Sequence, residues 1–173
     1  MANKKKEEKG KVVKFEKKVN FDGVLTKIQI PIKDEIPKIV YNKTVSKGTK
    51  NITFDGNGRA LKEFIEALQN LSDYFLEVVE ITGKEDETII TGVSFSDTGI
   101  VITGQISLVN NGINSPLIVN TPHLVFEAVG GGYEIPEHAK ELIKELKKQA
   151  VLYMSGEAAE VQTDLFEGNA NGK

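Results

Sequence analysis

The chain contains no cysteine, so it forms neither a disulfide nor a thiolate metal site. It also lacks any apolar run long enough to span a bilayer. No apolar stretch follows the charged residues 1–9, so we expect no secretory signal. These absences favour a cytoplasmic protein without membrane contact, and its 173 residues are enough to bury a core.

Histidine is scarce, and the motifs of common enzyme classes are missing. Only His123 and His138 occur, and neither has a second ligand at the spacing that metal sites need. Gly83 and Lys84 are followed by Glu85, where a phosphate-binding loop requires Ser or Thr. We therefore expect no metal, no cofactor and a non-enzymatic function, although carboxylates that converge from distant positions would escape this test.

Charge is distributed unevenly, and the basic part lacks arginine. Residues 1–50 hold 14 Lys and 6 acidic residues, a net charge of +8, whereas the remainder carries −11. Lysine contacts with phosphates supply affinity that does not depend on sequence, and without arginine we expect loose tracking of the backbone rather than base reading. The candidate nucleic-acid-binding residues are Lys11, Lys14, Phe15, Lys17, Lys18, Lys27, Tyr41 and Lys43. Two other roles remain open: lysines protect exposed strand edges from aggregation, and aromatic side chains pack in cores.

Hydrophobic periodicity divides the chain into three parts: a disordered basic arm at 1–10, a single α+β domain at 11–156, and a flexible tail at 157–173. Alternating residues predict strands at 11–18, 24–32, 36–45, 51–54, 89–95, 100–108, 116–120 and 123–128. Apolar stripes predict two amphipathic helices, from about residue 57 to 72 and from 136 to 156. Residues 74–82 fit a helix or a strand equally well.

Alternation also predicts which side chains share a face. It places Val24 with Ile28 on one face of the 24–32 strand, and Ile89 with Val93 on one face of the 89–95 strand. Gly92 leaves a gap in such a row, which is typical of a bulge, a tight bend or a close approach of another backbone. Gly104 leaves a similar gap.

The order of three strands, a helix and further strands resembles that of an OB-type barrel, and also that of a sliding-clamp half-domain. The expected fold class is therefore α+β, either an antiparallel sheet or a small barrel with OB-like order, together with the two amphipathic helices. The barrel resemblance implies that Phe15 and Tyr41, with Phe21 and Phe54, stack on the bases of a single strand.

The tail contains the pentapeptide Gln162, Thr163, Asp164, Leu165 and Phe166. It resembles the peptide that bacterial replication and repair proteins insert into the sliding clamp. The match holds at four positions and departs at Thr163, where the family usually has Leu. The resemblance implies clamp-binding residues Gln162, Asp164, Leu165 and Phe166. In the alternative interpretation, Leu165 and Phe166 fold back onto the domain as an anchor.

Two functions remain open from the sequence. The first is a non-enzymatic accessory protein of DNA replication or recombination, phage-encoded in one interpretation. It would bind single-stranded DNA through the basic N-terminal β surface and the sliding clamp through its tail. The second is an oligomeric phage inhibitor, or a ligand-sequestering protein, that acts on a host enzyme or defence system. Homo-oligomer formation belongs to this second hypothesis.

Overall fold

The computed structural model of the protein describes residues 21–107, 115–127 and 133–156. The elements run in the order β1 (Val24–Gln29), β2 (Lys38–Val45), β3 (Gly48–Asp55), α1 (Lys62–Gln69), α2 (Ser72–Val78), η1 (Glu85–Glu87), β4 (Thr88–Phe95), β5 (Gly99–Ile106), β6 (Leu117–Asn120), β7 (Leu124–Val125), β8 (Tyr133–Glu134) and α3 (Glu137–Met154). The strands form an eight-stranded sheet in the order β3-β2-β1-β4-β5-β7-β8, and β6 also pairs with β5.

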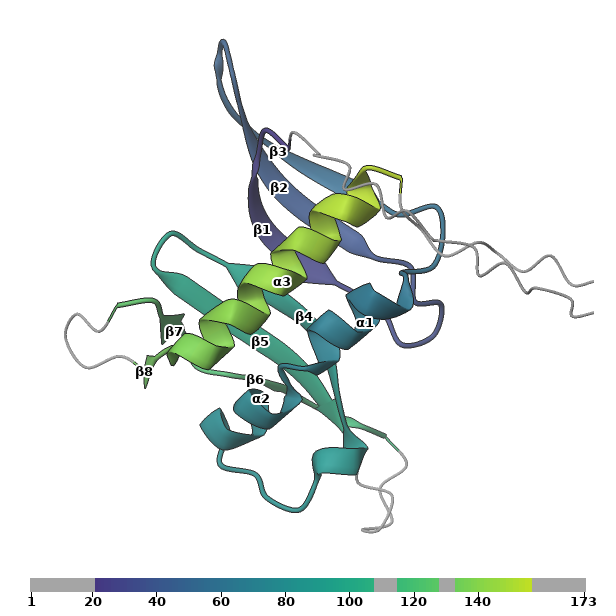
Figure 1. Ribbon diagram of the computed structural model, residues 1–173, viewed down its shortest axis with the longest axis vertical. Coiled ribbons are helices and arrows are strands. Elements are labelled where there is room, and N and C mark those ends of the chain that lie inside the picture. Colours follow the sequence, from purple (N-terminus) through teal and green to yellow (C-terminus); the bar gives the residue numbers. More distant parts are fainter. Residues whose placement is uncertain (1–20, 108–114, 128–132, 157–173) are drawn as a thin grey trace, which may run out of the picture.

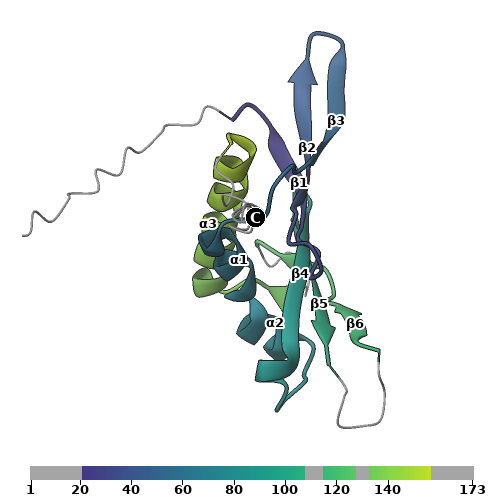
Figure 2. The ribbon, with the colours of Figure 1, turned by 90° about the vertical axis from the view of Figure 1, so that its right-hand side faces the viewer.

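The sheet is open, and the helices cover one of its faces (Figures 1 and 2). Its pairs are antiparallel except for β7 with β8. Within the described residues, the end strands β3 and β8 do not pair with each other. The α+β fold with an antiparallel sheet is therefore confirmed, and the small barrel is wrong. The reason is that helices, rather than a closing strand, cover the apolar face of the sheet.

The helices differ in number and bounds from the prediction. The first predicted helix is shorter, because Leu61 is extended and Ala60 donates its N–H to the carbonyl of Glu35. Residues 74–82 are helical as far as Val78, in a separate short helix. The last helix follows Pro136 and ends before Gly156, whose φ of +102° suits glycine, as the sequence predicts. No helix in the described part of the chain is long and apolar enough to cross a membrane.

The core lies between the helices and the covered face of the sheet. Helix α3 crosses the sheet diagonally (Figure 1), so that it packs on strands from both halves of the chain. Tyr153, near its C-terminal end, lies against Phe54 of β3, with 6.0 Å between ring centroids. Earlier in the helix, the Nζ of Lys147 lies 4.6 Å from the ring centroid of Phe95 in β4. Between these two contacts the helix passes over the part of the sheet where β1 and β4 pair over three residues (Figure 1).

Two β-bulges change the faces that simple alternation predicts. In β1 the register shifts between Leu25 and Lys27, so Leu25 is buried with Ile28 and Val24 is 63% exposed. In β4 a shift after Ile90 has the same effect: Ile90 is buried and Ile89 is 41% exposed. The predicted faces of Val24 and Ile89 are therefore wrong, because one inserted residue exchanges the two faces of a strand.

Both glycines that interrupt the predicted side-chain rows allow close packing. A Cβ at Gly92 would lie 2.8 Å from the carbonyl oxygen of Ile28, and a Cβ at Gly104 would lie 2.7 Å from Cζ of Phe75. Gly92 thus allows the backbone of β1 to approach the bulged part of β4. Gly104 leaves room for the aromatic ring of Phe75, which α2 places over the sheet.

The side chain of Gln69, the last residue of α1, completes the hydrogen bonding of the β4 bulge. Its Nε2 donates to the carbonyl of Ile90 at 2.8 Å, and its Oε1 accepts from the N–H of Ile90 at 2.9 Å. Ile90 is buried, so its backbone polar groups have little access to water. The Gln69 side-chain amide thereby makes the two hydrogen bonds that the backbone of a neighbouring strand would otherwise make with Ile90.

Tyr153 fixes the end of α3 to the loop before α1. The side chain is buried, its hydroxyl donates to the carbonyl of Gly58, and burial raises the pKa of this hydroxyl.

We expect Tyr153→Phe to lower the free energy of unfolding by about 1 kcal/mol, because the Gly58 carbonyl loses its donor. Urea unfolding followed by circular dichroism measures this loss. Tyr133→Phe is the matched control because Tyr133 is exposed. Equal effects of the two substitutions would contradict the prediction.

Candidate nucleic-acid interface

Most of the predicted functional residues lie outside the part of the chain that the structure describes. This applies to the clamp-peptide residues Gln162, Asp164, Leu165 and Phe166, and to the nucleic-acid candidates Lys11, Lys14, Phe15, Lys17 and Lys18. It applies equally to the predicted arm at 1–10, the strand at 11–18 and the tail at 157–173. Lys27, Tyr41 and Lys43 are the candidates that can be placed.

The sheet separates these three candidates onto two faces. Tyr41 pairs with Leu25, whose side chain is buried in the core, so Tyr41 lies on the covered face of the sheet. Lys43, two residues further along β2, shares that face. Lys27 pairs with Val40 and therefore lies on the uncovered face. The structure brings Tyr41 and Lys43 near each other and does not bring Lys27 to them.

The aromatic residues proposed for base stacking pack within the fold. The rings of Tyr41 and Phe21 are in edge contact, with 5.1 Å between centroids, and both pack against the core. Phe54 likewise packs against the core through Tyr153. Core packing, the alternative role that the sequence leaves open, accounts for these three rings.

The β2–β3 hairpin carries the strongest basic cluster that we find among the described residues. Its two strands continue beyond the end of the helical layer, as Figure 2 shows. At the base of the hairpin, Lys38 and Asp55 form an ion pair of 3.2 Å. The distal part, residues 43–50, holds Lys43, Lys47 and Lys50 and has no acidic residue. We call these residues the hairpin lysines.

Two of the hairpin lysines lie directly opposite each other. The β2–β3 register runs without a shift from Lys38 with Asp55 to Val45 with Gly48, and it pairs Lys43 with Lys50. Like charges at directly opposed positions destabilise a strand pair. Lys43 also has Asp22 at 3.9 Å, but that carboxylate is 86% exposed and such surface pairs contribute little. The distal hairpin is therefore a site of concentrated positive charge.

The sequence interpretation missed Lys47 and Lys50. The alternating pattern predicts one strand that ends at Val45 and an extended segment that begins at Asn51, which places both lysines in the connection between them. The structure instead has a two-residue turn, Ser46 and Lys47, followed by Gly48 with φ of +121°. A glycine after two polar residues, flanked by β-branched residues, is the signal that predicts this hairpin.

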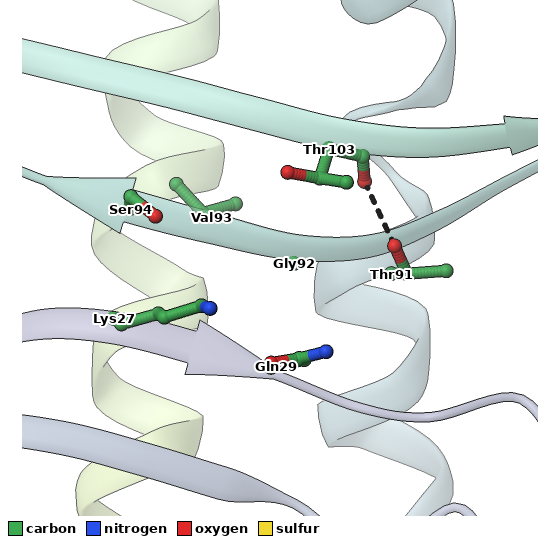
Figure 3. Close-up of a pocket in the computed structure, with 7 residues that line it drawn as sticks. All are labelled: Lys27, Gln29, Thr91, Gly92, Val93, Ser94 and Thr103. Atoms are coloured by element: carbon green, nitrogen blue, oxygen red, sulfur yellow. Dashed lines mark hydrogen bonds between the residues drawn. The ribbon is translucent and has the colours of Figure 1, made fainter. Parts of the chain in front are cut away.

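The uncovered face of the sheet has a small hollow at the β4 bulge (Figure 3). It is lined by Lys27, Gln29, Thr91, Gly92, Val93, Ser94 and Thr103, with a volume of about 70 Å³. The hydroxyl of Thr91 donates to the carbonyl of Thr103 at 3.3 Å across it. The hollow has room for about two water molecules and is much smaller than typical small-ligand sites.

A serine and a histidine come together at the β4–β5 turn. Ser96 Oγ lies 3.1 Å from His123 Nε2, a pairing that the sequence did not reveal because 27 residues separate the two. The same Oγ also exchanges hydrogen bonds with the N–H and carbonyl of Gly99, both at 3.1 Å. These bonds join the hairpin turn to the segment before β7, so the geometry suits a structural link.

Acidic residues gather at the other end of the molecule from the hairpin. Helix α2 and the residues after it form an open depression lined by Asp73, Leu76, Glu77, Glu80, Ile81 and Thr82. Figure 1 places α2 and the β2–β3 hairpin at opposite ends of the long axis. No group of three His, Asp or Glu side chains in the described ranges is arranged to hold a metal ion. The described domain therefore has one basic and one acidic end.

No protein-family model matches the chain, and neither the curated proteins nor the solved structures compared with it gave a significant match.

Proposed function

We propose that the chain is a non-enzymatic accessory protein of DNA replication or recombination that acts in the cytoplasm. Its C-terminal peptide binds the bacterial sliding clamp, and its body contacts nucleic acid. The observation that carries this proposal is the clamp-type pentapeptide, Gln162 to Phe166.

The end of the described domain supports the proposal. Helix α3 ends at Met154, and Gly156 has the positive φ typical of a helix stop. Gln162 follows Gly156 by six residues, and a chain of that length has a typical reach of about 12–15 Å. This reach is sufficient to present the pentapeptide away from the surface of the domain.

Titration of full-length protein into purified bacterial sliding clamp tests the proposal. We expect micromolar affinity, about −8 kcal/mol, which is typical of a short peptide in a groove. Leu165→Ala combined with Phe166→Ala is expected to weaken binding at least 100-fold, roughly 3 kcal/mol, because two buried apolar side chains are removed. Thr163→Leu restores the usual family residue and is expected to tighten binding by roughly fivefold.

A matched tail variant separates the motif from the tail as a whole. Asn169→Ala with Asn171→Ala also alters two tail residues but leaves the pentapeptide intact, so clamp affinity should stay unchanged. Thermal unfolding should be the same for all of these variants. Clamp affinity that survives the Leu165 and Phe166 substitutions would refute the proposal and favour the inhibitor hypothesis.

A further inference from the structure

We infer that the β2–β3 hairpin is an arm that binds the phosphate backbone of duplex DNA through Lys43, Lys47 and Lys50. This inference rests on the proposed contact between the body and nucleic acid. It names the surface that makes the contact and the form of nucleic acid that the surface fits.

The shape of the hairpin suits a duplex groove. A two-stranded β-ribbon fits the major groove of B-DNA, which is about 12 Å wide. The three residue pairs from Lys43 with Lys50 to Val45 with Gly48, together with the two-residue turn, extend the ribbon by roughly 13 Å beyond Asn42. This distal part lies beyond the helical layer (Figure 2), so a duplex can approach it without contacting α1 or α3.

The chemistry of the hairpin favours phosphates over bases. Residues 42–53 contain no aromatic side chain and no arginine. The nearest rings, Tyr41 and Phe54, are engaged with Phe21 and Tyr153. Single-strand binding uses stacking on aromatic rings, whereas lysines with hydroxyl groups contact the phosphates of a duplex. The exposed hydroxyls of the distal hairpin belong to Thr44, Ser46 and Thr49.

Protection of sheet edges explains only part of the cluster. A single lysine on the edge strand is enough to discourage edge-to-edge pairing, and Lys50 of β3 fulfils that role. Lys43 follows Asn42, the last residue of β2 that pairs with β1, so β2 is an open edge there as well, whereas Lys47 lies in the turn. The opposed ammonium groups of Lys43 and Lys50 repel each other, and a bound phosphate would reduce this repulsion. The acidic end at α2 is far from the hairpin, so it does not oppose this approach.

The test measures the salt dependence of binding to a short duplex of mixed sequence and to one of its single strands, with full-length protein. Lys43→Gln, Lys47→Gln and Lys50→Gln are combined in one variant. Each phosphate contact contributes about 0.9 to the slope of log Kobs against log salt, so the slope should become shallower by about 2.7. Equivalently, the ratio of the duplex-binding constant of the wild type to that of this variant should fall roughly 40-fold between about 50 mM and 200 mM salt.

A charge-matched variant controls for net charge. Lys62→Gln, Lys144→Gln and Lys148→Gln also remove three exposed lysines, but these lie on α1 and α3. The duplex slope should stay within about 0.5 of the wild type, because these lysines make no phosphate contact in the proposed complex. Lysines elsewhere in the chain that contact phosphates contribute equally to the slope of the wild type and of the hairpin variant. The difference between the two slopes therefore reports the hairpin lysines alone.

The possible results separate the inference from the proposed function. Equal slope changes in the two triple variants, or tighter binding to the single strand than to the duplex, would overturn the hairpin inference while leaving nucleic-acid binding by the body intact. Failure to bind either DNA would overturn both the inference and the body contact. Clamp titration of the same hairpin variant should give wild-type affinity, because the tail is unchanged.

Discussion

Replacing Phe75 by alanine is expected to lower the free energy of unfolding by about 3–5 kcal/mol, a large part of the stability of a domain of this size. The ring is fully buried and lies against Gly104 of β5, a position without a side chain that could fill the space. Truncation therefore leaves a cavity between α2 and the sheet. Denaturant unfolding followed by circular dichroism measures the change.

Two further variants define the origin of this effect. Ile118→Ala is the surface control, since Ile118 is 62% exposed, and it should change stability by less than about 0.5 kcal/mol. Gly104→Ala should be destabilising in the wild type, because the new Cβ meets the Phe75 ring. It should cost less in a Phe75→Leu background, where the flat ring is absent. A loss below about 1 kcal/mol for Phe75→Ala would contradict the expectation of a rigid cavity.

Replacing Gln69 by leucine is expected to cost about 2–4 kcal/mol. The substitution leaves both the N–H and the carbonyl of Ile90 without the partner that they have in the bulge. Leucine has a similar size, so the loss of packing is small and the loss of hydrogen bonding dominates. Denaturant unfolding measures the cost, and Gln105→Leu on the uncovered face serves as the control. A cost as small as that of the control would mean that water replaces the amide.

Gln69→Glu adds a pH dependence with a definite sign. The introduced carboxylate can accept from the Ile90 N–H but repels the Ile90 carbonyl, whereas the protonated acid can donate to it. Its pKa in the folded state should therefore exceed the unfolded value of about 4.3. The stabilising contribution is fully present below the unfolded pKa and is lost as pH rises through the folded pKa. Stability relative to wild type should thus improve on acidification, and Gln105→Glu should lack this response.

The fold class was predictable because most of the strands and the last helix have regular patterns. Pro136 and Gly156 mark the bounds of α3, and the apolar stripe between them identifies its buried face. The bulges were not predictable in the same way. A bulge shifts the alternation by one residue, and a sequence pattern alone does not show whether Val24 or Leu25 continues the buried row. The bond between Gln69 and Ile90 depends on tertiary contact between elements that are distant in sequence.

The candidate interface was predictable in its charge but not in its geometry. The excess of lysine in residues 1–50 indicated a basic region, and Lys43 was among the residues named. The cross-strand position of Lys50 follows from the turn at Ser46 and Lys47, which fixes the register of the hairpin. For the aromatic candidates the sequence leaves both stacking and core packing open, because composition does not reveal on which face a ring lies. The clamp peptide is a linear motif, so its evidence remains in the sequence.

The diagonal course of α3 affects how the protein forms during synthesis. Strands β1 to β3 leave the ribosome before α3, yet Phe54 completes its packing only when Tyr153 is available. Likewise, Phe95 of β4 is next to Lys147 in the finished fold. The part of the apolar face that α3 covers therefore stays exposed until the chain has been made through Met154. Folding of this domain is consequently completed only after α3 has been made, and truncations within α3 should yield aggregation rather than a smaller stable domain.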